Sequence, residues 1–291
     1  MKNINSFELF LIEKLHINKG VDILSDEIYS RYKSTGSYIM NDTRSGLFIN
    51  KIYITISDDI GEDSYGFLDI NKSHNTKKGW VIYLYLKSGF YLSTIQHECN
   101  HIFQLMNMNK NDILNKLNYI KAGYHSNIKS IDESGEFFYM IYLSSNSEIN
   151  SIVNESYGLI KEAFGNKKIS SDQFISIIKL TRGYNISKTL IDYNIDDNFK
   201  NLSKNDINKF FYLFEENKKK LDKINDSKFE FFRKIKLIIA AFKSLNSGNT
   251  YSYIDSKKYI PNRGKDYYQK FINNQGDKLK SKLYKLYDHF T

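Results

Sequence analysis

The spacing of apolar residues changes along this chain near residue 90, from mixed strand-like and helix-like patterns to an almost entirely helix-like pattern. Segments rich in β-branched and aromatic residues predict strands at 47–49, 51–56 and 80–86, with a further short strand within 36–41. Apolar residues at helical spacing predict helices at about 5–16 and 22–33. The first part of the chain is therefore expected to fold as a few helices and a small sheet.

Beyond residue 90 the pattern favours helices. They are expected at about 91–104, 110–121, 134–144, 147–164, 171–182, 204–222, 228–245 and 265–289. A chain of 291 residues, 41% of them hydrophobic, can bury a substantial core. Together these patterns predict an α+β fold. We expect a core domain at 1–165 that contains the small sheet, followed by a mostly α-helical region at 166–291 that packs on it.

Charge is distributed unevenly along the sequence, whose formal net charge is +9. Residues 1–200 carry 22 Lys and Arg against 23 Asp and Glu, whereas residues 201–291 carry 20 against 10. Any attraction to an acidic partner should therefore act through the basic C-terminal third. The lysines there alternate with Phe, Leu and Tyr, as on the solvated face of amphipathic helices, and arginine is scarce. This pattern argues against a nucleic-acid interface.

Neither an export signal nor a membrane segment is evident. No segment approaches the roughly 18 apolar residues of a spanning helix, and residues 1–8 lack the features of a signal peptide. The single cysteine, Cys99, excludes an intrachain disulfide. We therefore expect a cytoplasmic protein that does not enter a membrane.

The candidate chemistry lies in the predicted helix at 91–104, which contains His97-Glu98-x-x-His101. Two histidines four residues apart share one helix face, so both imidazoles can reach one zinc ion. The adjacent glutamate can then face a water molecule in the open position of that ion. At 100° per residue the buried face would hold Leu92, Ile95, Cys99, Ile102 and Met106, roughly opposite the histidines. The pattern predicts a zinc site with Glu98 as general base.

A catalytic zinc site needs a third protein ligand. The metzincin spacing is excluded because Gln104 and Asn107 stand where it requires Gly and His, and no glutamate occurs between residues 102 and 132. The remaining candidates before residue 160 are Asp112, His125, Asp132, Glu133, Glu136, Glu148 and Glu155. We choose Glu148, in the first turns of a predicted helix, with Glu155 as the next choice. An alternative role stays open, because Ser145-x-x-Glu148 is also a capping box.

The apolar strand, the helix with His97-Glu98-x-x-His101 and the later segment Asn146-Ser147-Glu148-Ile149-Asn150 resemble zincin metallopeptidases of the gluzincin type. The similarity covers about residues 47–160 and is strongest to members encoded by phages and bacteria. It implies a zincin-like lobe with Zn²⁺ bound by His97, His101 and Glu148, and Glu98 as the catalytic residue. It also implies that the strand at 80–86 edges the cleft and binds extended peptide. The chain departs from thermolysin-like relatives in lacking their Asp after the third ligand.

The resulting hypothesis is a zinc metalloendopeptidase that hydrolyses a peptide or protein substrate with a zinc-activated water. Two alternatives stay open: an inactive zincin-fold structural or virion-associated protein, and a nucleic-acid-binding protein that uses the basic C-terminal third. The candidates for stabilising an oxyanion are Tyr124, His125, Tyr142 and Tyr157. Neither the cleavage specificity nor the oligomeric state is indicated by the sequence.

Overall fold

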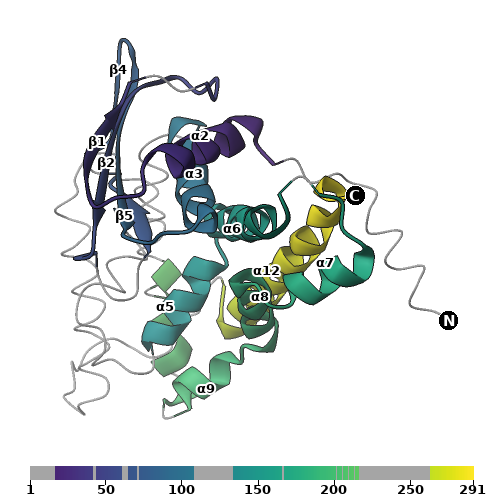
Figure 1. Cartoon of the computed structure of the whole chain (residues 1–291). Helices are drawn as coiled ribbons and strands as arrows, with labels where there is room; N and C mark the ends of the chain where they lie inside the picture. Colours follow the sequence, from purple (N-terminus) through teal and green to yellow (C-terminus); the bar gives the residue numbers. More distant parts are fainter. Residues whose placement is uncertain are drawn as a thin grey trace. The chain divides into compact units, whose positions relative to one another are not determined.

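The computed structural model describes residues 17–107 except 42–43, 61–64 and 71, residues 134–215 except 166, 201, 205, 209 and 213, and residues 263–291. The fold is mixed α+β, as predicted, with one small sheet and mostly helical content (Figure 1). The described residues belong to two compact units. Unit 1 contains those up to residue 107 together with 145–189 and 276–291, and unit 2 contains those of 134–144 and 190–275.

The sheet of unit 1 has five strands in the order β1-β2-β5-β3, with β4 also paired to β5. Their bounds are β1 Gly36–Met40, β2 Ile49–Ser57, β3 Gly66–Leu68, β4 His74–Thr76 and β5 Gly79–Lys87. β2 and β5 are parallel, whereas β1, β3 and β4 run antiparallel to their neighbours. The strands predicted within 36–41 and at 51–56 and 80–86 are confirmed. β3 and β4 were not predicted, because three residues are too few to establish a period.

The expectation that the strand at 80–86 edges the cleft and binds extended peptide stays a prediction, but β5 is a central strand of the sheet. β5 pairs along its length with β2 on one side, and on the other side with β3 at residues 84–86 and with β4 at 79–81. A strand paired on both sides has no free row of N–H and C=O groups to offer a peptide. The nearly continuous apolar run of Trp80 to Leu86 is typical of such a central strand.

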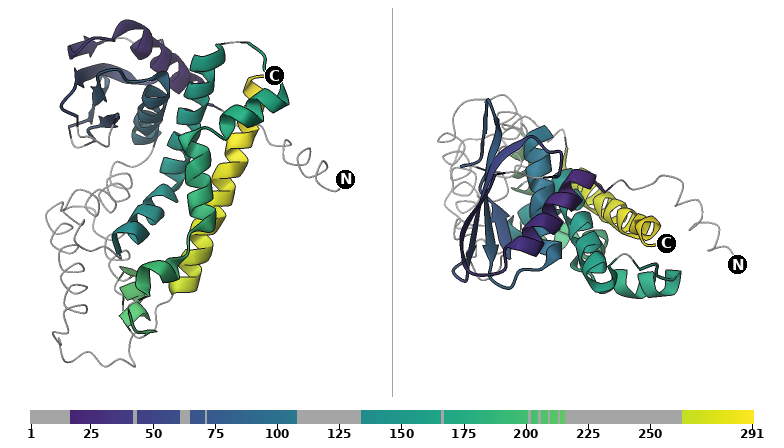
Figure 2. Two further views of the ribbon diagram at one scale, coloured as in Figure 1. Left: turned by 60° about the horizontal axis from the view of Figure 1, so that its bottom comes forward. Right: turned by 45° about the horizontal axis from the view of Figure 1, so that its top comes forward.

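The helices of unit 1 pack on the sheet and on one another. They are α2 Lys19–Arg31, α3 Leu92–Asn107, α6 Asn146–Phe164, α7 Ser171–Ile178, the part of α8 (Arg182–Asp192) up to Thr189, the end of α12 (Lys265–Lys285) and the 3-10 helix η3 Leu286–His289. Figure 2 shows α2 and α3 on the same side of the sheet. α3 buries Leu92, Ile95, Cys99, Ile102 and Leu105, so the predicted buried face is confirmed except that Leu105 replaces the half-buried Met106.

The close packing of α3 against α6 depends on a glycine. A Cβ atom on Gly158 of α6 would lie 2.9 Å from the Cα of Ser93 and 2.8 Å from the Cγ of Gln96, both on α3. The first turn of α3 is also tied to α6, because the backbone N–H of Leu92 donates to Oε2 of Glu162 at 3.2 Å. These contacts fix the distance between the two helices.

Unit 2 contains α5 Ser134–Leu143, α9 Ile195–Phe199, the end of α8, the beginning of α12 and the described part of 202–215. Its core is aromatic, and Phe137 contacts the rings of Phe138, Phe199, Phe210, Phe211, Phe214 and Tyr268. The hydroxyl of Tyr268 donates to the buried carboxylate of Glu215. The described part of the predicted helix at 204–222 therefore contributes Phe210, Phe211 and Phe214 to this core.

Part of the basic C-terminal third belongs to unit 1. In that unit, Nζ of Lys278 on α12 donates to Oδ1 of Asn146 on α6 at 2.8 Å, and the N–H of Ile169 donates to the carbonyl of Phe290 at 2.9 Å. The predicted domain boundary between residues 165 and 166 stays a prediction. The helices predicted at 5–16, 110–121 and 228–245 lie outside the described residues. Within the described ranges, no helix is both long and apolar enough to cross a lipid bilayer.

Candidate metal centre

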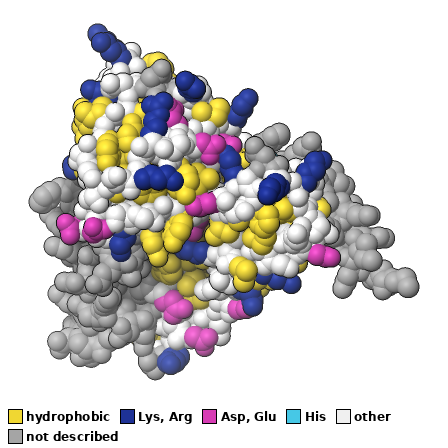
Figure 3. Space-filling model, in the orientation of Figure 1, with side chains coloured by type: hydrophobic (Ala, Val, Ile, Leu, Met, Phe, Trp, Pro, Cys, Tyr) yellow, Lys and Arg dark blue, Asp and Glu magenta, His cyan; other side chains and the backbone are white. Residues whose placement is uncertain are grey.

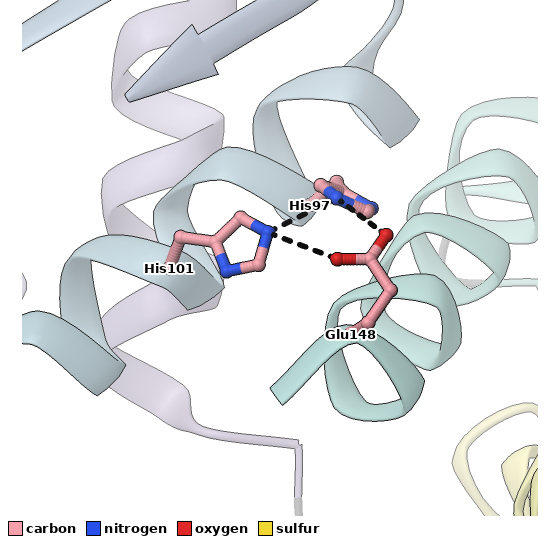
Figure 4. A group of neighbouring side chains, drawn as sticks. All are labelled: His97, His101 and Glu148. Atoms are coloured by element: carbon pink, nitrogen blue, oxygen red, sulfur yellow. Dashed lines mark hydrogen bonds and ion pairs between the residues drawn. The ribbon is translucent and has the colours of Figure 1, made fainter. Parts of the chain in front are cut away.

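Three side chains from two helices of unit 1 meet at one point. His97 and His101 extend from α3 and Glu148 extends from the first turn of α6, with its carboxylate facing both imidazoles (Figure 4). The Nε2 atoms of the two histidines are 3.2 Å apart. Oε1 of Glu148 lies 3.5 Å from Nε2 of His97, and Oε2 lies 3.6 Å from Nε2 of His101. The group could hold a metal ion, since its candidate ligand atoms all lie within 4.8 Å of one another.

These three side chains are withdrawn from water. The side chain of Glu148 is 2% exposed, and those of His97 and His101 are 12% and 10% exposed. Oε2 of Glu148 is buried and accepts no hydrogen bond from the residues that the structure describes. A buried carboxylate oxygen without a donor is costly. A cation between the three groups would satisfy it.

The capping box suggested for Ser145 and Glu148 forms only in half. Oγ of Ser145 accepts the backbone N–H of Glu148 at 3.2 Å and so caps α6. The Glu148 carboxylate does not return to the backbone of Ser145 but faces the imidazoles. The cap and the approach to the histidines are therefore compatible, because they use different atoms of Glu148.

Hydrogen-bond partners at Nδ1 hold the imidazole of His101 in one tautomer. Nε2 of Gln104 donates to the carbonyl of Ser147 at 2.9 Å, which leaves Oε1 of Gln104 as an acceptor 3.1 Å from Nδ1 of His101. Nδ1 must then carry the proton. Oγ of Ser151 lies 3.2 Å from the same Nδ1 and donates to the carbonyl of Ser147 at 3.1 Å. With Nδ1 protonated, the lone pair of Nε2 points at the centre, as a metal ligand requires.

The imidazole of His97 is held by a carboxylate that was not predicted for this role. Its Nδ1–H donates to Oε2 of Glu155 at 3.1 Å, and the same oxygen accepts a 2.8 Å hydrogen bond from Nη1 of Arg182. Glu155 thus contacts the side of the ring away from the centre, where it can orient the ligand but cannot be one. The spacing of Glu148 and Glu155 could have indicated that both approach the same site, because residues two helical turns apart share a face of α6.

The charges of the site separate the pKa values of the two histidines. Burial lowers the pKa of His97, but the carboxylates of Glu148 and Glu155 outweigh burial and help to raise it to about 9. Burial and then the charge of His97 lower the pKa of His101. Near neutral pH the imidazole of His97 in the metal-free site therefore carries a proton on each nitrogen. Its Nε2–H can donate to Nε2 of His101. A metal ion would have to displace that proton.

Glu98 is buried on α3 beside the histidines, with 7% of its surface exposed. Its charge acts to raise the pKa of both His97 and His101. Cys99 takes no part in the group. It is buried in the core, where burial raises the pKa of its thiol to about 12, opposed by a hydrogen bond with Ser25.

The other predicted site residues do not join this group. Glu136 belongs to unit 2 and accepts a 2.8 Å hydrogen bond from Nδ2 of Asn198. Tyr157 directs its hydroxyl to Asp22 of α2 at 3.4 Å. Tyr142, half-buried on α5, also belongs to unit 2. The remaining candidates lie outside the described residues: Asp112, Tyr124, His125, Asp132 and Glu133.

Comparisons of this chain with models of known protein families, with curated proteins and with solved structures find no match.

We predict that the stability of the metal-free protein decreases as pH rises from 6.5 to 9. The pKa of His97 rises from 6.5 to about 9 on folding, so its contribution is fully present below pH 6.5 and is lost as pH rises through 9. The free energy of unfolding, measured by urea denaturation with a chelator present, should fall by up to roughly 3 kcal/mol over this window. The His97→Gln variant should lack the slope, and a flat profile for the natural protein would contradict the assignment.

Proposed function

We propose that this protein is a zinc-dependent peptidase of the zincin type, in which His97, His101 and Glu148 bind Zn²⁺ and Glu98 is the general base. The observation that carries the proposal is the convergence of two Nε2 atoms and a buried carboxylate on one point. The partners behind each ring support it, because they leave both Nε2 atoms directed at that point.

The distances between the donor atoms fit zinc. Zinc ligands at about 2.0–2.1 Å in a tetrahedron lie about 3.3–3.4 Å from one another. In this site the two Nε2 atoms are 3.2 Å apart, Oε1 of Glu148 is 3.5 Å from Nε2 of His97, and Oε2 is 3.6 Å from Nε2 of His101. Two imidazoles and one carboxylate are also the donor set of many catalytic zinc sites, which keep a fourth position for water, whereas Mg²⁺ and Ca²⁺ prefer oxygen ligands.

Each residue then has a distinct task in peptide hydrolysis. A zinc ion bound here would supply Lewis acidity, polarising the scissile carbonyl and lowering the pKa of a water molecule. The Glu98 carboxylate, buried beside both histidines, would accept the proton of the attacking water and pass it to the leaving amine. Glu155 and Gln104 would keep the two imidazoles aligned.

The nucleic-acid alternative gains no support from the described residues. On the face shown in Figure 3, Lys and Arg side chains are scattered among acidic and apolar ones and do not form one patch. Several lysines of the C-terminal third also have partners within their own unit, including Lys278 with Asn146 and Lys282 with Asn150. We therefore propose no second function.

We predict that the purified full-length chain binds one zinc ion, and that His97→Ala or His101→Ala abolishes binding. Each histidine supplies one of three protein ligands, so its loss leaves an incomplete site. His74→Ala is the matched control, because His74 is exposed on β4 and its Nδ1 lies 2.8 Å from the carbonyl of Lys72. Metal content after dialysis provides the measurement. Stoichiometric zinc in a protein lacking both His97 and His101 would refute the site.

We predict that Glu98→Gln retains zinc but loses hydrolysis. The amide preserves shape and hydrogen bonding but cannot accept the proton, and a positioned general base contributes about 10²–10⁴-fold. The assay is digestion of a broad peptide library by the zinc-loaded natural protein and the variant, with zinc content measured in the same samples. Equal cleavage by both proteins would exclude Glu98 as the base. Full zinc binding without cleavage by either would favour the inactive zincin alternative.

A further inference from the structure

Arg182 is linked to the candidate metal centre through one intervening residue, Glu155. Its Nη1 donates to Oε2 of Glu155 at 2.8 Å, and that same oxygen accepts Nδ1–H of His97 at 3.1 Å. Guanidinium, carboxylate and imidazole thus form a chain of hydrogen bonds that ends at a ring whose other nitrogen faces the centre. The side chain of Arg182 is 50% exposed, whereas that of Glu155 is 20% exposed.

The backbone of α8 is packed so that Arg182 reaches Glu155. Arg182 begins α8 and Gly183 follows it. A Cβ atom on Gly183 would lie 2.6 Å from Oγ of Ser156 and 3.0 Å from Cγ2 of Ile152, both on α6. The absence of a side chain at this position lets the first turn of α8 approach α6 beside Ser156, which is the neighbour of Glu155.

Oε2 of Glu155 accepts two hydrogen bonds, one from Nδ1–H of His97 and one from Nη1 of Arg182. Because 20% of its side chain is exposed, the carboxylate could instead turn toward water. The hydrogen bond from Arg182 opposes this rotation and holds Oε2 against the imidazole of His97.

We propose that Arg182 is a positioning residue of the metal centre, which holds Glu155 on Nδ1 of His97 and thereby keeps Nε2 of His97 directed at the metal. This inference rests on the proposed metal binding and adds a residue to it. The competing interpretation is a half-exposed salt bridge that has no role at the metal centre and contributes little to stability, as is usual for exposed ion pairs.

The test is metal affinity in the full-length chain, measured by titration with Zn²⁺ against a competing chelator and with Co²⁺ as a spectroscopic probe. The variants are Arg182→Met, Arg182→Lys, Glu155→Gln and the double variant Arg182→Met with Glu155→Gln. Arg31→Met is the matched control, because the side chain of Arg31 is 51% exposed and pairs with Glu27 on α2 at 2.7 Å. Urea unfolding of each metal-free variant separates a loss of folding from a loss of affinity.

Loss of a group that orients a metal ligand typically costs 10–100-fold in affinity. We expect Arg182→Met to weaken Zn²⁺ binding by about tenfold and to alter the visible absorption of bound Co²⁺, with Arg182→Lys between it and the natural protein. Because Arg182 acts through Glu155, the double variant should bind no more weakly than Glu155→Gln alone. Arg31→Met should match the natural protein.

Two results would overturn the positioning role while leaving the metal centre intact. One is natural affinity and an unchanged Co²⁺ spectrum in Arg182→Met. The other is full multiplication of the two losses in the double variant, which would mean that Arg182 acts independently of Glu155. If the natural protein binds neither ion, the wild-type titration alone reveals it, and the proposed function fails together with the inference.

Discussion

The packing of α3 against α6 is the constraint on which the candidate site depends. The two helices approach closely at Gly158, and a polar seam runs between them, formed by His97, Asn100, His101 and Gln104 of α3 and by Glu148, Ser151 and Glu155 of α6. The members on α3 occupy positions i, i+3, i+4 and i+7, and those on α6 occupy i, i+3 and i+7, which places each set on one helix face. A shift of α6 by a fraction of a turn would separate every pair at once.

Burying these polar side chains is unfavourable in free energy unless they form hydrogen bonds with one another. Around His101 they do, because Ser151 donates to the carbonyl of Ser147 and accepts from Nδ2 of Asn100 at 3.0 Å. Around His97 and Glu148 the buried polar atoms are less completely hydrogen-bonded. Oε2 of Glu148 accepts no hydrogen bond within the described residues, and the carboxylates of Glu148 and Glu155 help to raise the pKa of His97. A divalent cation between the three groups would satisfy that oxygen.

Much of the site could be predicted from local sequence. The spacing of His97 and His101 defines a shared face on any helix, and Glu148 stands in the first turn of a segment whose cap is also readable. The helices around them were predicted for the same reason, since helical periodicity is local. The contact between Glu148 and the imidazoles needed the packing of two helices that are distant in sequence, and only the structure supplies it.

The parts that sequence reasoning missed are those decided by partners far along the chain. Strand pairing is not local, so the apolar run of β5 could not reveal that both its edges are occupied. Glu155 was considered as a ligand, but its place behind His97 depends on the direction in which α3 presents the ring. Arg182 carried no signal, because a single arginine at the start of a helix has many roles. The role of Gly158 and Gly183 in helix packing could not be predicted either, because it depends on neighbours in other helices.

The central claim, a zinc ion held by two histidines of α3 and one carboxylate of α6, is tested most directly by zinc-edge X-ray absorption of the zinc-loaded protein. The account predicts about four nitrogen and oxygen scatterers at roughly 2.0–2.1 Å. It also predicts outer-shell scattering from two imidazole rings. A sulfur scatterer at about 2.3 Å would contradict it, because Cys99 is buried away from the centre. A spectrum with no imidazole contribution would contradict it equally.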